Sequence, residues 1–140
     1  MDKFMQPTVL AGSVAVIVLC VLLVASVQRR RPRRPDHARF QKRWHEIQGF
    51  CKTANTWPLA IINADRLLDE ALKRLRCKGK TMGERLVSVQ RRLSDNDGVW
   101  YAHKLRNRVV HEEMGDLKRR DVESALRGFR QALIDLGALE

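Results

Sequence analysis

The sequence lacks the features that mark a β-protein, a disulfide-stabilised protein or a zinc protein. It has no runs of alternating β-branched residues and no Asn-Gly hairpin turn. Its three cysteines, Cys20, Cys51 and Cys77, form no CxxC pair, and no histidine lies at zinc-finger spacing from them. This pattern indicates a reducing compartment. Carboxylates and histidines do not cluster at metal-ligand spacing either, so we expect no metal and no cofactor.

Charged residues are also missing from one long run, residues 9–27. As an α-helix this run would span roughly 28 Å, close to the ~30 Å hydrocarbon core of a bilayer. Five arginines follow it: Arg29, Arg30, Arg31, Arg33 and Arg34. Positive residues stay on the cytoplasmic side of a membrane. We therefore predict an N-terminal segment, 1–28, that contains a single-pass transmembrane helix at about 9–27. Its N-terminus would lie outside the cell membrane and the C-terminal domain in the cytoplasm.

Residues 29–35 form a short basic linker, because Pro32 and Pro35 interrupt any helix that leaves the membrane. Its arginines are either a stop-transfer signal or a membrane-surface site for anionic lipid. A cleaved signal peptide and a buried helix are the alternatives for the apolar run. A signal peptide would carry its positive charges first, however, and a small-residue cleavage site after the run.

Residues 36–140 are long enough for one small domain with its own core. They carry 21 basic and 15 acidic side chains. An excess of positive charge favours anionic partners, either lipid headgroups or nucleic acid. No internal repeat is visible.

The apolar residues of this domain recur at helical spacing, which predicts an all-α bundle of about five helices. The expected helices are 36–54, 57–76, 81–93, 99–112 and 116–136. Thr56 before Pro58 and Thr81 before Glu84 are expected N-caps, and Gly79 and Gly137 are expected stops. The predicted core positions are Phe40, Trp44, Ile47, Cys51, Leu59, Ile62, Leu68, Leu72, Leu75, Leu86, Val87, Val89, Leu93, Tyr101, Ala102, Leu105, Val109, Val122, Leu126, Phe129, Leu133 and Leu136.

One helix combines residues with catalytic chemistry. His103, Asn107 and His111 recur at i, i+4 and i+8 and are predicted to point outward, with Arg106 at the edge of the row. Histidine transfers protons near neutral pH, and arginine holds phosphate by two parallel hydrogen bonds. Such a row beside an RNA 2′-hydroxyl supports cleavage without a metal. A solvated basic helix face is the alternative.

The stretch from Arg106 to His111, Arg-Asn-Arg-Val-Val-His, resembles the R-x4-6-H signature of the HEPN superfamily in its RN-x3-H form. The helix count and order of residues 36–136 are similar as well. The resemblance implies a small all-α bundle, usually a homodimer, in which Arg106, Asn107 and His111 form a metal-independent endoribonuclease site at the dimer interface. Glu113 occupies the place where toxin members often carry tyrosine.

Other basic residues around this helix are weaker candidates for RNA phosphate binding: His103, Arg108, Lys118, Arg119 and Arg120. The predicted function is that of a membrane-anchored HEPN-like RNA-binding protein and candidate endoribonuclease. The alternative is a non-catalytic HEPN-like module that binds a protein partner or serves as a scaffold at the membrane. The predicted partners are membrane lipid, RNA and a second copy of the chain. Convergence of Arg106 and His111 on one polar cleft would favour the enzyme, whereas ion-paired or singly exposed side chains would favour the module.

Overall fold

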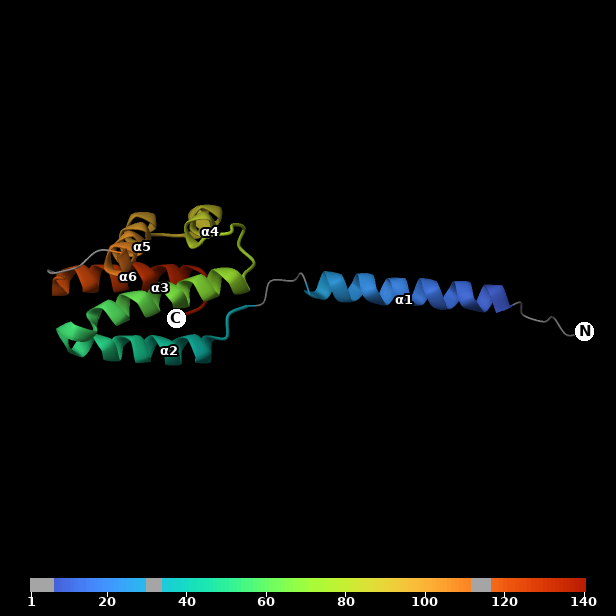
Figure 1. Cartoon of the computed structure of the whole chain (residues 1–140), viewed down its shortest axis with the longest axis horizontal. Helices are drawn as coiled ribbons and strands as arrows, with labels where there is room; N and C mark the ends of the chain where they lie inside the picture. Colours follow the sequence, from blue (N-terminus) through green and yellow to red (C-terminus); the bar gives the residue numbers. More distant parts are fainter. Residues whose placement is uncertain (1–6, 30–33, 112–116) are drawn as a thin grey trace, which may run out of the picture. The chain divides into compact units, whose positions relative to one another are not determined.

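The computed structural model describes residues 7–29, 34–111 and 117–140, with the side chains of the first helix described from Gly12 to Gln28. Every regular element in these ranges is a helix, which confirms the predicted all-α class. The chain divides into two compact units, Met1–Pro32 and Arg33–Glu140 (Figure 1). Each unit is described by itself.

The first unit contains one helix, α1 (Pro7–Arg29). Among the described residues, no helix combines the length and the apolar character that crossing a membrane requires. This finding contradicts the predicted single-pass topology and cell-membrane localisation.

The predicted membrane-surface role of the arginine cluster stays a prediction. Arg30, Arg31 and Arg33 lie outside the described residues, as does the side chain of Arg29. Arg34 begins the described part of the second unit, where its side chain is exposed.

The second unit begins with α2 (His37–Gly49), which Asp36 caps by accepting a hydrogen bond from the backbone N–H of Arg39 at 3.4 Å. The helix is shorter than predicted. Two 3-10 turns, η1 (Phe50–Lys52) and η2 (Ala54–Thr56), follow it, with an extended Thr53 between them. The Thr56 hydroxyl does not cap the next helix. It donates instead to the carbonyl oxygen of Phe50 at 2.6 Å, which holds the turn together.

The longest helix of the second unit is α3 (Trp57–Arg74), and Pro58 lies in its first turn as predicted. Its stop differs from the prediction. Arg76, rather than Gly79, takes the left-handed conformation at the end of the helix, with φ of 55°. The N–H of Cys77 donates to the carbonyl of Leu72, and that of Arg76 to the carbonyl of Lys73, both at 3.0 Å. These are the two hydrogen bonds of a Schellman motif.

Three further helices complete the unit: α4 (Met82–Val89), α5 (Asn96–His111) and α6 (Arg119–Asp135), with the 3-10 turn η3 (Gln90–Arg92) after α4. One of the two hydrogen bonds of the predicted capping box of α4 is present: the Thr81 hydroxyl accepts from the backbone N–H of Glu84 at 3.2 Å. Helix α5 begins three residues earlier than predicted. Gly137 ends α6 in the left-handed conformation, as predicted.

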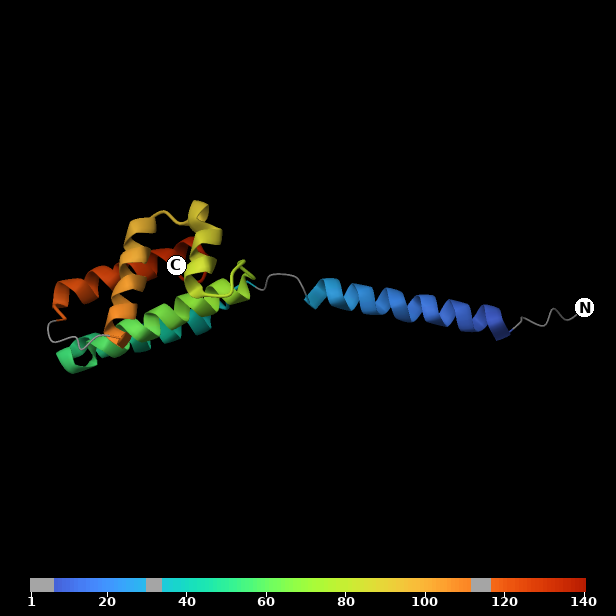
Figure 2. The ribbon, with the colours of Figure 1, turned by 45° about the horizontal axis from the view of Figure 1, so that its top comes forward.

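Helices α2, α3 and α6 run alongside one another, and α4 and α5 run across them (Figures 1 and 2). The shared core contains most of the predicted positions, including fully buried Phe40, Leu68, Leu72 and Phe129. Three predicted core residues are exposed instead: Leu59 at 45%, Val87 at 53% and Tyr101 at 41%. Tyr101 lies at the edge of the core, where its hydroxyl donates to Oδ1 of Asp121 on α6 at 3.3 Å.

Candidate functional site

A buried carboxylate lies at the centre of the candidate site. Asp65 is 4% exposed and belongs to the middle of α3, between the apolar residues Ala64 and Leu67. Its Oδ1 lies 2.8 Å from Nδ1 of His103 on α5. Its Oδ2 lies 3.4 Å from Nε of Arg106, one helical turn further along α5. Asp65 therefore connects α3 to α5, the helix that carries the motif from Arg106 to His111. The apolar spacing of α3 did not single out Asp65, although an acid inside an apolar stripe is a signal for a buried partner.

Arg106 is held from two sides. Its Nη1 donates to Oδ1 of Asn107 at 3.0 Å, and its guanidinium pairs with Asp65. The buried Nε of Arg106 nevertheless forms no hydrogen bond. The 3.4 Å approach to Asp65 is an ion pair without a directed N–H, so part of the donor capacity of this guanidinium is unused.

These side chains line an open pocket of about 390 Å³ between α3, α4 and α5. The pocket is lined by Asp65, Arg66, Asp69, Thr81, Met82, Gly83, Arg85, His103, Arg106 and Asn107. Its basic side chains are Arg66, Arg85 and Arg106, opposite two carboxylates. A polar pocket with paired charges and a histidine can accept an anionic group, because the arginines provide several donors.

Arg85 builds one wall of this pocket and is itself buried. It donates to Oδ1 of Asp69 through Nε at 3.0 Å and through Nη2 at 2.5 Å. Its Nη1 donates to the carbonyls of Gly79 and Lys80, both at 3.0 Å, and so closes the loop before α4. Burial alone would raise the pKa of the Asp69 carboxyl, but hydrogen bonds and charge from Lys73 and Arg85 outweigh it and lower the pKa. Asp69 thus stays ionised, and Arg85 is occupied by structural bonds.

The predicted outward row is wrong in its first member. His103 does not face solvent, since its side chain is 13% exposed and contacts Asp65. It also lies edge-on to Trp100, with ring centroids 6.0 Å apart. The apolar pattern of α5 alone could not show this, because the helix buries a second, polar side against α3.

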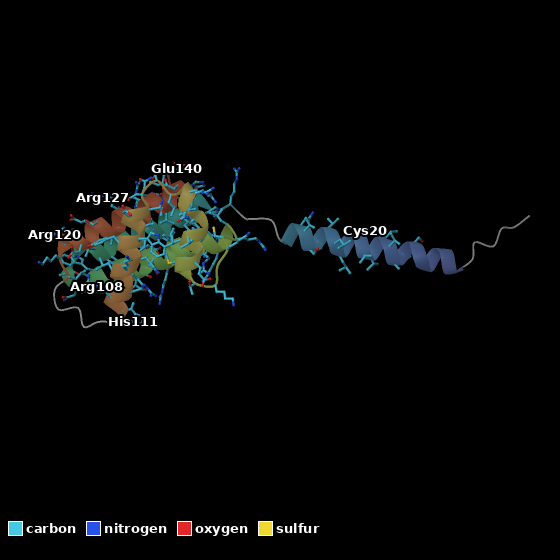
Figure 3. The ribbon with its side chains drawn as sticks, turned by 90° about the horizontal axis from the view of Figure 1, so that it is seen from above. Cys20, Arg108, His111, Arg120, Arg127 and Glu140 are labelled. Atoms are coloured by element: carbon cyan, nitrogen blue, oxygen red, sulfur yellow. The ribbon has the colours of Figure 1, made fainter. Side chains whose placement is uncertain are left out.

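His111 is separated from the other two predicted catalytic residues. It is the last residue of α5 (Figure 3), it is exposed, and it is not among the residues that line the pocket. It lies five residues after Arg106, which places the two side chains about 140° apart around the helix axis. Within one chain the structure brings together Arg106, Asn107 and His103, but not His111.

The weaker phosphate-binding candidates also lie outside the pocket. Arg108 is exposed on α5 (Figure 3). Lys118, Arg119 and Arg120 are exposed at the start of α6. Arg119 lies over the Trp57 ring at 5.8 Å and pairs with Glu123 at 3.6 Å. None of these four residues shares the pocket of Arg106.

Among the described residues, no group of three or more histidine, cysteine, aspartate or glutamate side chains could hold a metal ion. The pocket itself offers arginine donors and one imidazole that Asp65 orients.

Comparison of the chain with protein-family models, with curated proteins and with solved structures finds no match. The resemblance to the HEPN superfamily therefore depends on the motif from Arg106 to His111 and on the order of the helices.

Proposed function

We propose that residues 33–140 form a HEPN-like RNA-binding domain, whose pocket holds a backbone phosphate of single-stranded RNA through Arg106. One observation carries this proposal: Arg106, Asn107 and His103 gather at the buried carboxylate of Asp65 and line one open pocket. Asp65 and Asn107 fix the orientation of the guanidinium, whose planar set of N–H donors matches the geometry of phosphate. The positive excess of this domain favours the same polyanion.

The test is RNA binding by the 33–140 fragment, since the core residues of the described part of the chain lie between Phe40 and Leu139. A fluorescently labelled 12-nucleotide single-stranded RNA is titrated in EDTA and followed by anisotropy. Arg106→Gln should weaken binding about 10- to 100-fold, because a charge-assisted hydrogen bond contributes roughly 1.5–3 kcal/mol. Arg130→Gln is the matched control, because Arg130 is exposed on α6 and donates to the carbonyl oxygen of Glu140 at 3.0 Å. Equal affinities for all three proteins would refute the site.

Cleavage of the bound RNA is a second candidate function, favoured by the Asp65–His103 pair. Because Nδ1 of His103 faces Asp65, Nε2 is the nitrogen left to accept a proton. In such a reaction the RNA 2′-oxygen attacks phosphorus while its proton passes to Nε2. The bond from phosphorus to the 5′-oxygen breaks, and the 5′-oxygen takes a proton from water. Asp65 positions the ring, as carboxylates do for catalytic histidines.

The HEPN resemblance assigns proton transfer to His111 instead, at the interface of a homodimer. The two assignments separate in one assay with the same RNA in EDTA. His103→Gln should abolish cleavage if the pocket within one chain is the site, with a typical loss of 10²- to 10⁴-fold. His111→Ala should abolish it if a dimer completes the site. Binding without cleavage by the parent fragment would identify an RNA-binding domain that is not an enzyme. Absence of binding would leave the protein-interaction module.

A further inference from the structure

A second group of arginines lies on α2 and α3, away from the pocket of Arg106. Three guanidinium groups surround the carboxylate of Glu70. Arg39 lies 3.2 Å from it and Arg74 3.0 Å from it, and Arg43 forms both a hydrogen bond and an ion pair with it. We call these four residues the Glu70 cluster. One carboxylate balances one of three positive charges, so the cluster keeps a net charge of about +2 at neutral pH.

The cluster is oriented rather than loosely solvated. The side chains of Arg43 and Arg74 are only 32% and 29% exposed. The Arg74 guanidinium also lies over the Phe40 ring at 5.8 Å, and Phe40 is fully buried. Guanidinium groups that are already fixed lose little conformational entropy when they bind an anion.

The geometry of α3 connects the Glu70 cluster to the pocket. Successive residues of an α-helix are rotated by about 100°, so Asp65 and Arg74 lie on opposite sides of α3 and about 14 Å apart along its axis. Asp65 faces α5, whereas Arg74 and Glu70 meet α2. Arg66 and Lys73 project between them on the outward side of α3, where both are exposed.

These positions place a strip of basic side chains over α3, from the pocket of Arg106 to the Glu70 cluster. Its exposed or partly buried basic residues are Arg39, Arg43, Arg66, Lys73, Arg74 and Arg106. The acids within it are Asp65, Asp69 and Glu70, and each of them pairs with at least one of these basic residues or with His103. A flexible chain of phosphates matches such a strip, because it can follow the curved surface of a helix.

We infer that single-stranded RNA crosses α3 from the pocket of Arg106 to the Glu70 cluster, where Arg39, Arg43 and Arg74 bind its backbone phosphates. This inference rests on the proposed RNA-binding function and extends it to the path of the strand. The rival explanation is that the Glu70 cluster is only an ion-pair network that joins α2 to α3.

Glu70→Gln separates the two explanations, because they predict changes of opposite sign. In an RNA-binding cluster this change removes a repelling carboxylate and releases three guanidinium groups for phosphate. Affinity should then rise by about threefold or more at low salt. In a purely structural network the same change would loosen the contact of α2 with α3 and leave RNA affinity unchanged or lower.

The experiment uses the full-length protein and a labelled 12-nucleotide uridine RNA, at several salt concentrations. Each phosphate contact with single-stranded nucleic acid contributes about 0.7 to the slope of log affinity against log salt. The double change Arg39→Gln with Arg43→Gln should lower the slope by about 1.4, whereas the Arg130→Gln control should leave it unchanged. Helical content by circular dichroism establishes that each variant is folded.

Tighter binding by Glu70→Gln together with the reduced slope of the double variant supports the path. If the parent binds RNA but Glu70→Gln does not bind more tightly, or the double variant keeps the parent's salt slope, the path is overturned while the pocket of Arg106 stands. If the parent does not bind RNA, both the path and the proposed function are refuted.

Discussion

Replacing Gly128 by alanine tests how closely two helices of the bundle approach. Gly128 is buried in the middle of α6. A Cβ atom added there would lie 2.3 Å from the carbonyl oxygen of Gly98 on α5 and 2.5 Å from its carbonyl carbon. Side-chain motion cannot relieve this contact, because the atoms that it meets belong to the backbone. Helices α5 and α6 would have to move apart.

The expected cost follows from two opposing effects. Alanine is favoured over glycine inside a helix by about 1 kcal/mol. Overpacking of a close-packed core costs about 1–3 kcal/mol, and the upper part of this range, about 2–3 kcal/mol, applies here because the strain is on the backbone. We therefore expect Gly128→Ala to lower the free energy of unfolding by about 1–2 kcal/mol. The corresponding decrease in Tm is several degrees, since each kcal/mol shifts a domain of this size by about 4–8 °C.

Gly49→Ala provides the matched control. Gly49 ends α2 with helical angles, φ −59° and ψ −35°, and no atom would lie within 4 Å of the added Cβ. This variant should be more stable than the parent by up to about 1 kcal/mol. Urea unfolding of the 33–140 fragment, followed by circular dichroism, measures both changes. Equal stability of Gly128→Ala and the parent would refute the close approach of α5 and α6.

Three further predictions concern the core, the ion pairs and the thiols. Leu72→Asp places an unpaired carboxylate at a position of 0% exposure, so it should lower the free energy of unfolding in urea by several kcal/mol. An unchanged urea midpoint would contradict the assignment of Leu72 to the core. Partial burial would raise the pKa of Glu70, but hydrogen bonds and charge from Arg43, Arg39 and Arg74 lower it. The stability that this carboxylate contributes is therefore present above its unfolded pKa and is lost as the pH falls through the lower folded pKa. Glu70→Gln should reduce the decrease in the free energy of unfolding over this acid range. Burial raises the pKa of the Cys51 and Cys77 thiols, so both should be alkylated more slowly at pH 7 in the folded fragment than in urea, as mass spectrometry would measure.

The local pattern of the sequence was sufficient for the helices themselves. Apolar residues at helical spacing placed Phe40, Leu72 and Phe129 in the core, because an amphipathic helix must bury its apolar side. Thr81 marked a helix start and Gly137 a helix end for reasons confined to one turn of backbone. The same pattern predicted a membrane span over residues 9–27, but no helix among the described residues is long and apolar enough to cross a membrane.

Only the tertiary structure decided which helix faces meet. The position of Asp65 in an apolar stripe acquired its meaning from His103 and Arg106, which lie on another helix about 40 residues away. The same crossing of α3 and α5 turned His103 inward and left His111 exposed at the helix end. Helical spacing fixes the angles between side chains on one helix. Their partners depend on how helices cross, and that is set by the packing of the whole core.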